Sequence, residues 1–305
     1  MIAGDAIRTP LVRLQVDVPD TEIWLKLESL QPIGSFKIRA AANAIRQASV
    51  EAVAGGVWTT SAGNMAQGVA WMARDLGVPA TIVVPDHAPR AKTDAIERLG
   101  GRVIRVPFDR WWQAMEEGSY PGVEGLFVHP VMNEKVMAGN GTIGLELVEQ
   151  LDGIDAVLIP WGGGGLTTGI ASALAALSPA TKVYACEPET GAPATAALAN
   201  GGVPVPVDYR ASFVDGSGSK ALLPPMWERA RGLLSGAFAL SLDETAAAVR
   251  LLAERAHVIA EGAGALAAAA ATSGRAGKGR VVCIVSGGNI DSGRLAAILE
   301  GRVPD

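Results

Sequence analysis

The chain contains 305 residues, of which 49% are hydrophobic and 19% charged, a composition that excludes a disordered protein and provides enough length for about two domains. Glycine accounts for 37 residues, above its usual share of about 7%, so several places need the backbone freedom that glycine provides. The net charge of −5 argues against nucleic acid as the main partner, because phosphate binding needs a basic face.

Segments typical of strands and helices alternate along the chain. Apolar runs predict strands at residues 23–27, 57–60, 81–84, 102–106, 156–160, 183–187 and 281–285. Helical spacing of apolar residues predicts helices at 36–47, 64–76, 91–99, 142–151, 166–177, 242–256, 262–272 and 290–300. This alternation predicts an α/β protein whose parallel sheets are covered by helices on both faces.

Residues 156–181 carry no charge and are numerous enough to cross a bilayer. Pro160, Pro179 and four consecutive glycines interrupt this stretch, which indicates a buried strand, a loop and a helix. The first residues also lack the basic and apolar regions of a signal peptide. We therefore expect a cytoplasmic protein with no membrane segment.

The four glycines, Gly162, Gly163, Gly164 and Gly165, join the strand at 156–160 to the helix that follows. Their N–H groups, with the helix dipole, can bind a phosphate without Lys or Arg. A P-loop is excluded because no Lys follows. A dinucleotide fingerprint fails because threonine stands where its third glycine is needed, although Glu187 lies near the place of the ribose-binding acid. A cofactor phosphate and a tight turn without ligand both remain open.

Lys37 stands at the start of a predicted helix, where burial and the helix dipole both lower the pKa of an amine. A lysine of this kind suits Schiff-base chemistry, whereas the alternative is an ordinary exposed lysine. A second polar turn, Ser61–Gly68, follows a strand and offers backbone N–H groups to a carboxylate, or is a helix start capped by Ser61 or Asn64. A third, Ser286–Asn289, follows the strand at 281–285. Ligands of α/β sheets gather at such strand ends.

These turns belong to a set of motifs that lie in one order along nearly the whole chain: Leu25–Glu28, Gly34–Arg39, Ser61–Gly68, Ala138–Glu146, Gly162–Gly165, Glu261–Leu266 and Ser286–Asp291. The sequence resembles the fold type II pyridoxal-phosphate enzymes, and within them the serine/threonine dehydratases. The resemblance implies a fold similar to the tryptophan synthase β chain, with two doubly wound parallel-sheet domains and the active site between them. It implies a large domain of residues 1–52 and 134–305, a small domain of residues 53–133, and a homodimer.

The resemblance also implies roles for single residues. Lys37 would form the Schiff base with pyridoxal 5'-phosphate and remove the substrate α-proton. The remaining cofactor contacts would come from Phe36 against the ring, Asn64 at the ring 3-oxygen, Ser286 at the pyridine nitrogen, and Gly162, Gly163, Gly164, Gly165, Leu166 and Gly216 near the phosphate or ring. The substrate carboxylate would be bound at Ser61, Ala62, Gly63, Asn64 and Met65.

The implied reaction removes water from an amino acid such as L-threonine or L-serine and yields a 2-oxo acid and ammonia. Met65 stands where the family usually has His, so a larger 3-hydroxy amino acid, such as hydroxyaspartate or an aryl-serine, is an alternative substrate. Serine racemases of the family carry Ser in place of Ala62, which cannot deliver a proton, so we expect poor racemisation. A phosphate- or nucleotide-binding module without catalysis is the alternative outside enzymes.

Two further features concern ions and specificity. Metal-dependent relatives use a Glu and, six positions later, an Asp; Glu187 matches the first, but Pro193 replaces the second, so we expect no metal. The segment 109–113 contains Trp111 and Trp112 and is either a wall that selects the substrate or apolar packing. The three histidines, His87, His129 and His257, are scattered and are expected to be structural.

Overall fold

The computed structural model describes residues 2–304, except for the side chain of Ala91. The chain divides into two compact units, which we describe separately. Unit 1 contains the residues up to Ile7 and Gln31–Asn140, and unit 2 contains Arg8–Leu30 and the residues from Gly141 onward. The sequence-based division into residues 53–133 and the rest stays a prediction.

Unit 1 is built on a parallel four-stranded sheet in the order β5-β4-β3-β6. Its strands are β3 (Val57–Thr59), β4 (Ala80–Pro85), β5 (Gly101–Val106) and β6 (Leu126–Phe127). Its helices are α1 (Lys37–Arg46), α2 (Val50–Ala54), α3 (Asn64–Leu76), α4 (Arg90–Arg98) and α5 (Phe108–Glu117). A further helix, α6 (Glu134–Gln150), begins in unit 1.

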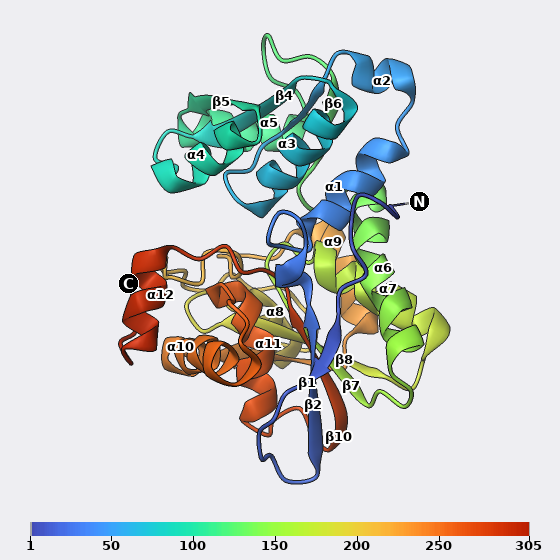
Figure 1. The fold of residues 1–305 in the computed structure, drawn as a ribbon, viewed down its shortest axis with the longest axis vertical. Helices are drawn as coiled ribbons and strands as arrows, with labels where there is room; N and C mark the ends of the chain where they lie inside the picture. The colour runs from blue at the N-terminus through green and yellow to red at the C-terminus, as the bar shows by residue number, and fades with distance from the viewer. Residues whose placement is uncertain (1, 305) are drawn as a thin grey trace. The chain divides into compact units, whose positions relative to one another are not determined.

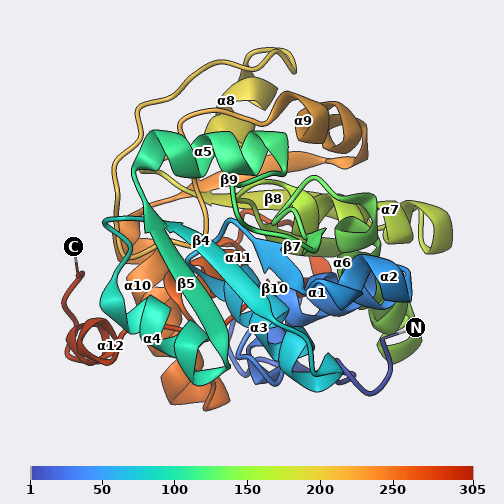
Figure 2. The same ribbon diagram turned by 90° about the horizontal axis from the view of Figure 1, so that it is seen from above.

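Side chains alternate across this sheet, and each face has its own core. Ile82 and Val84 of β4 pack with α1 and α3, whereas Val83, between them, packs with Trp58 and Trp111 on the face of α5. Figure 2 shows α5 on one side of β4 and β5, with α3 and α4 on the other. The doubly covered sheet explains why β4 is a continuous apolar run.

Unit 2 is built on a six-stranded sheet in the order β1-β2-β10-β7-β8-β9. Its strands are β1 (Leu11–Arg13), β2 (Thr21–Leu27), β7 (Ala156–Pro160), β8 (Lys182–Pro188), β9 (Gly236–Leu240) and β10 (Gly279–Val285). The strands are parallel except β1, which is antiparallel to β2. The predicted α/β class with parallel sheets is therefore confirmed, with one antiparallel edge strand added.

The helices of unit 2 cover both faces of the sheet. They are α7 (Gly165–Leu177), α8 (Pro193–Ala199), α9 (Pro224–Ala230), α10 (Leu242–Leu251), α11 (Gly262–Thr272) and α12 (Ser292–Leu299), with short turns η1 (Glu28–Leu30), η2 (Arg231–Leu233) and η3 (Leu252–Ala256). Cys186 of β8 faces the core that contains α11, whereas its neighbour Ala185 faces the core that contains Trp161 and Trp227. Figure 1 shows α11 and α7 on opposite sides of β7.

The charged motif at Leu25–Glu28 is structural. The side chain of Lys26 is fully buried in β2, where its ammonium donates to Thr9 O at 2.9 Å and to Gln150 Oε1 at 2.7 Å and pairs with Glu146. Glu28, also fully buried, accepts a hydrogen bond from Thr9 Oγ1 at 2.6 Å. Each buried charge therefore has the partners that burial requires.

Every predicted strand and helix is present, and residues 156–181 form β7, a loop and α7 as expected. The sequence analysis missed the short strands β1, β6 and β9 and the helices α2, α5, α8 and α9. The predicted helix at 142–151 begins earlier, at Glu134, and that at 242–256 changes to π-helical geometry after Leu251. None of the helices within residues 2–304 combines the length and hydropathy needed to cross a membrane.

Gly139 tests the close contact between α6 and α1. A Cβ atom at Gly139 would lie 2.3 Å from Arg39 O and 2.8 Å from Asn43 Cβ, so Gly139→Ala forces the helices apart. We expect a loss of about 1–3 kcal/mol in the free energy of unfolding, measured by urea denaturation. Gly232→Ala is the control, because a Cβ there meets no atom within 4 Å. Equal denaturation midpoints for the two variants would contradict this packing.

Candidate active site

Lys37, the first residue of α1, is half-buried as a whole residue, and its amine is surrounded by protein atoms. Burial lowers the pKa of its ammonium from 10.5 to about 8. Its Nζ donates a hydrogen bond to Pro130 O at 2.9 Å and lies 5.1 Å from the centre of the Phe36 ring. An amine with this pKa is neutral in a large fraction of molecules at pH 8, and the neutral form is the nucleophile and base.

The start of α3 has no side-chain cap. Its N-cap residue is Gly63 and no side chain caps the helix, so the alternative interpretation, a helix start capped by Ser61 or Asn64, is wrong. The Ser61 hydroxyl instead accepts a hydrogen bond from Gly63 N at 3.2 Å and so shapes the turn before the helix. The first N–H groups of a 13-residue helix form an anion site, and a carboxylate suits it.

A close helix contact holds this turn near Lys37 within unit 1. A Cβ atom at Gly68 of α3 would lie 3.1 Å from Lys37 O and 3.2 Å from Ala41 Cβ, so the backbones of α1 and α3 approach more closely than a side chain would allow. The structure therefore brings together Lys37 and the predicted carboxylate site, Ser61, Ala62, Gly63, Asn64 and Met65. Met65 itself is buried, and its side chain belongs to the core between these helices.

His129 was expected to be structural, and within unit 1 its imidazole binds backbone groups close to Lys37. Its Nδ1 accepts hydrogen bonds from Val131 N at 3.0 Å and Met132 N at 2.9 Å. Burial, and secondly the positive charge of Lys37, lower the pKa of His129 to about 4. Sequence spacing could not reveal this, because Lys37 and His129 are far apart along the chain.

The glycine loop of unit 2 lies between the end of β7 and the start of α7. Gly164 is the N-cap of α7 with φ +89°, and a Cβ on it would lie 2.9 Å from the Trp161 ring. A Cβ on Gly162 would lie 3.1 Å from Gly216 O, so the backbone of the glycine loop is adjacent to the backbone at Gly216. Ser217 Oγ donates to Trp161 O at 2.9 Å and fixes this arrangement.

The turn that carries Ser286 belongs to the same region of unit 2. Glu261 N, at the N-cap of α11, donates to Gly287 O at 3.0 Å, and a Cβ on Gly264 would lie 2.3 Å from that same oxygen. A Cβ on Gly216 would in turn lie 3.7 Å from Glu261 Oε1. The structure thus groups the residues predicted at the phosphate and the pyridine nitrogen, and Ser286 is buried.

Glu187, considered above as a ribose-binding acid or metal ligand, is engaged by α8. Its Oε1 accepts from Ala194 N at 3.0 Å, and its Oε2 accepts from Thr195 N and Thr195 Oγ1, both at 2.8 Å. Burial raises the pKa of this carboxyl to about 7. Among residues 2–304, no group of three or more His, Cys, Asp or Glu side chains lies close enough to hold a metal ion.

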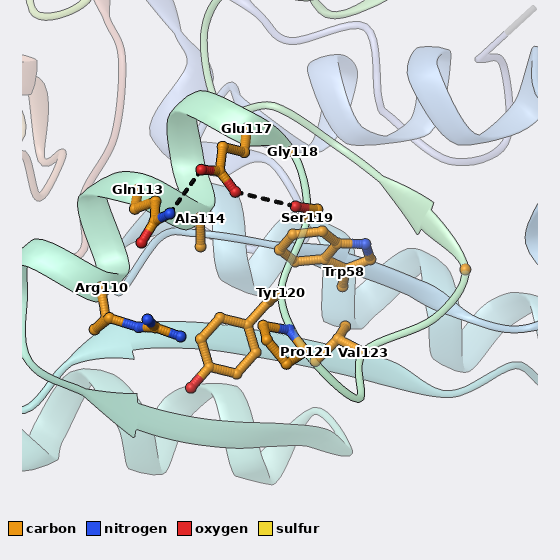
Figure 3. A pocket seen from close by; sticks show the side chains of 11 residues that line it. Trp58, Arg110, Gln113, Ala114, Glu117, Gly118, Ser119, Tyr120, Pro121 and Val123 are labelled. Carbon is orange, nitrogen blue, oxygen red and sulfur yellow. Dashed lines mark hydrogen bonds between the residues drawn. The ribbon is translucent and has the colours of Figure 1, made fainter.

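A pocket of about 430 Å³ lies in unit 1 beside α5, and its lining includes none of the residues predicted to bind the cofactor or the substrate carboxylate (Figure 3). Its lining includes Trp58, Arg110 and Tyr120, and Gln113 Nε2 donates to Glu117 Oε1 at 2.7 Å along its edge. Trp111 packs against the core cluster of Trp58, Val83 and Val106. This contact favours the packing interpretation of Trp111.

Comparison with known proteins decides the family. The family model described as "Pyridoxal-phosphate dependent enzyme" matches residues 2–287. The chain belongs to this family. It is 39% identical to the L-threonine ammonia-lyase of Thermotoga maritima over 290 residues, which are 93% of this chain and 71% of the relative. It is 37% identical to a catabolic L-threonine dehydratase of Staphylococcus aureus over 305 residues, 96% of this chain and 87% of the relative.

Solved structures agree on the fold. A maize serine racemase matches with a TM-score of 0.87 and 30% identity, over 98% of this chain and 94% of the other. A processed threonine deaminase isoform of Solanum lycopersicum matches with a TM-score of 0.86 and 32% identity, over 98% and 89%. The predicted fold type II architecture is therefore confirmed.

The residues present fit pyridoxal 5'-phosphate. A Schiff base needs an amine that loses its proton readily, which Lys37 provides. A phosphate needs backbone donors without a competing side chain, which the Gly162–Gly165 loop and the start of α7 provide. In the first turns of α7, the buried Thr168 Oγ1 has no hydrogen-bond partner within residues 2–304, so its hydroxyl group is available to a bound ligand.

Gly164 tests the phosphate loop. The φ of +89° strains any L side chain, and the Trp161 ring leaves no room for a Cβ, so Gly164→Ala distorts the loop. We expect the dissociation constant for pyridoxal 5'-phosphate to rise by about tenfold or more, measured by absorbance titration. Gly201→Ala is the matched control, because it has φ +66° and no atom within 4 Å of the added Cβ. Equal affinities in the two variants would reject the assignment.

Proposed function

We propose that this chain is a pyridoxal-phosphate-dependent dehydratase, or ammonia-lyase, that removes water from a 3-hydroxy amino acid of the L-threonine or L-serine type. The products are a 2-oxo acid and ammonia. The observation that carries the proposal is the amine of Lys37, with its lowered pKa, on a helix packed closely against the anion site at the start of α3. Relatives named L-threonine ammonia-lyase and L-threonine dehydratase support the same reaction.

Lys37 has two tasks in this proposal. Its Nζ would hold the cofactor covalently, and as a neutral amine it would accept the substrate α-proton. The bound cofactor supplies an electron-withdrawing ring that stabilises the negative charge formed at the α-carbon. The hydrogen bond from Nζ to Pro130 O orients the amine, because one N–H points at the carbonyl and the nitrogen lone pair therefore points away from it.

The substrate carboxylate is bound by the backbone N–H groups at the start of α3, with Ser61, Gly63, Asn64 and Met65 around it. Ala62 lies in the same turn, and its side chain cannot donate a proton to the substrate. Release of the β-hydroxyl needs a proton donor, since hydroxide is a poor leaving group. The proposal assigns no side chain of residues 61–65 to that step.

The other atoms of the cofactor would be bound by the residues that the family resemblance implies. Gly162, Gly163, Gly164, Gly165 and Leu166 bind the phosphate, and Gly216 lies beside them. Phe36 would contact the ring, Asn64 would bond the ring 3-oxygen and Ser286 would face the pyridine nitrogen. A serine hydroxyl stabilises a protonated pyridine nitrogen less than a carboxylate does, so the ring acts as a weaker electron acceptor.

The proposal also includes the domain division, the cellular location and the oligomeric state. Residues 53–133 form the small domain, which is supported by a sheet whose strands all lie within Val57–Phe127. Residues 1–52 and 134–305 form the large domain. The chain acts in the cytoplasm as a homodimer, as the family resemblance implies.

An assay of the purified enzyme tests the function. We expect 2-oxo acid release from L-threonine or L-serine, a loss of about a thousandfold or more in Lys37→Ala, and little change in the exposed control Lys220→Ala. Faster release from hydroxyaspartate or an aryl-serine would assign the larger substrates. Interconversion of L- and D-serine as fast as pyruvate release would overturn the dehydratase in favour of a racemase.

A further inference from the structure

The side chains of His129 and Lys37 both form hydrogen bonds with the backbone of one turn of unit 1. The turn covers residues 129–132, and His129 follows directly on the buried Val128. Val128 N donates to Trp58 O at 2.8 Å, and Thr59 Oγ1 donates to Val128 O at 2.8 Å, so the start of the turn is fixed to β3. On the far side of the turn, the imidazole accepts hydrogen bonds from Val131 N and Met132 N.

These hydrogen bonds define the state of the imidazole. Because Nδ1 accepts from two backbone N–H groups, the ring proton is on Nε2. Burial and the charge of Lys37 both disfavour the protonated imidazolium form of His129. A protonated Nδ1 also could not accept the two backbone hydrogen bonds. His129 is therefore a neutral acceptor across the physiological pH range.

The group that this turn presents to Lys37 is the carbonyl of Pro130. Lys37 Nζ donates to Pro130 O at 2.9 Å, and Pro130 lies between His129 and the two residues whose N–H groups His129 binds. Proline has no N–H and a fixed φ, so the direction of its carbonyl depends on how its neighbours are held. The imidazole holds them on one side, and β3 holds them on the other.

We propose that His129 is a positioning residue for Lys37: by accepting two N–H groups of the 129–132 turn through Nδ1, it fixes the Pro130 carbonyl that orients the lysine amine. The inference rests on the proposed function, in which the released amine acts as base. It adds a residue to the site that neither the sequence analysis nor the comparisons assign.

A matched pair of substitutions isolates the Nδ1 acceptor. His129→Asn places an amide oxygen where it can accept N–H groups two and three residues later, as asparagine does in Asx turns. His129→Leu has nearly the same size and shape but no acceptor. His129→Gln is the third variant, because its longer side chain carries its oxygen beyond the position of Nδ1.

Steady-state kinetics with L-threonine give the first readout. We expect His129→Leu and His129→Gln to lower kcat by about tenfold to a hundredfold with KM nearly unchanged, since the misdirected group is the base. His129→Asn restores kcat to within a few-fold of the wild type. Wild-type kcat in His129→Leu, or equal losses in the Asn and Leu variants, would overturn the proposal. Should His129→Leu fail to fold by circular dichroism, the Asn and Gln comparison decides.

A second readout needs no turnover. The pH dependence of labelling of Lys37 by an amine-reactive reagent, followed by peptide mass spectrometry on the full chain freed of cofactor, reports the pKa of the amine. Loss of the Pro130 acceptor disfavours the ammonium, so the midpoint in His129→Leu falls by about half a pH unit and returns in His129→Asn. An unchanged midpoint in His129→Leu contradicts the proposal even if the substrate assignment is wrong, so the two failures are distinguishable.

Discussion

The removal of one amine from water is the constraint on which the site depends. Lys37 is placed by α1 where burial lowers the pKa of its ammonium to about 8, and within unit 1 the Pro130 carbonyl accepts a hydrogen bond from it. An exposed lysine with a pKa of about 10.4 would be almost fully protonated at neutral pH and unable to act as nucleophile or base. The close contact of α1 with α3 at Gly68 follows from the same need, because it holds the anion site near the amine.

Glycine explains how an acidic chain can bind an anionic cofactor. In unit 2 the proposed phosphate site uses backbone N–H groups and the α7 dipole instead of lysine or arginine side chains. Gly162, Gly164 and Gly216 lie so close to neighbouring atoms that a Cβ on any of them would approach another atom within 3.1 Å. These three glycines therefore lie where backbones approach more closely than a side chain would allow.

Most of the fold could be predicted from local sequence patterns, whereas the roles of the site residues came from the family resemblance and stay predictions. The apolar runs of β4, β7 and β10 lie in doubly covered sheets and are recognisable without tertiary information. Short edge elements such as β1 and β6 have too few residues for a periodic signal. The helix α5 was not predicted, because its segment was interpreted through its aromatic residues around Trp111. The surroundings of His129 and Glu187 could not be predicted, because they depend on which N–H groups the folded backbone directs toward these side chains.

The pKa of Lys37 tests the account most directly. The full chain, freed of cofactor, is labelled with an amine-reactive reagent over a range of pH, and each lysine peptide is quantified by mass spectrometry. The account predicts that labelling of Lys37 rises with a midpoint near pH 8, well before the exposed lysines of the same digest. A profile for Lys37 that coincides with those of the exposed lysines would contradict the claim that burial prepares this amine for its chemistry.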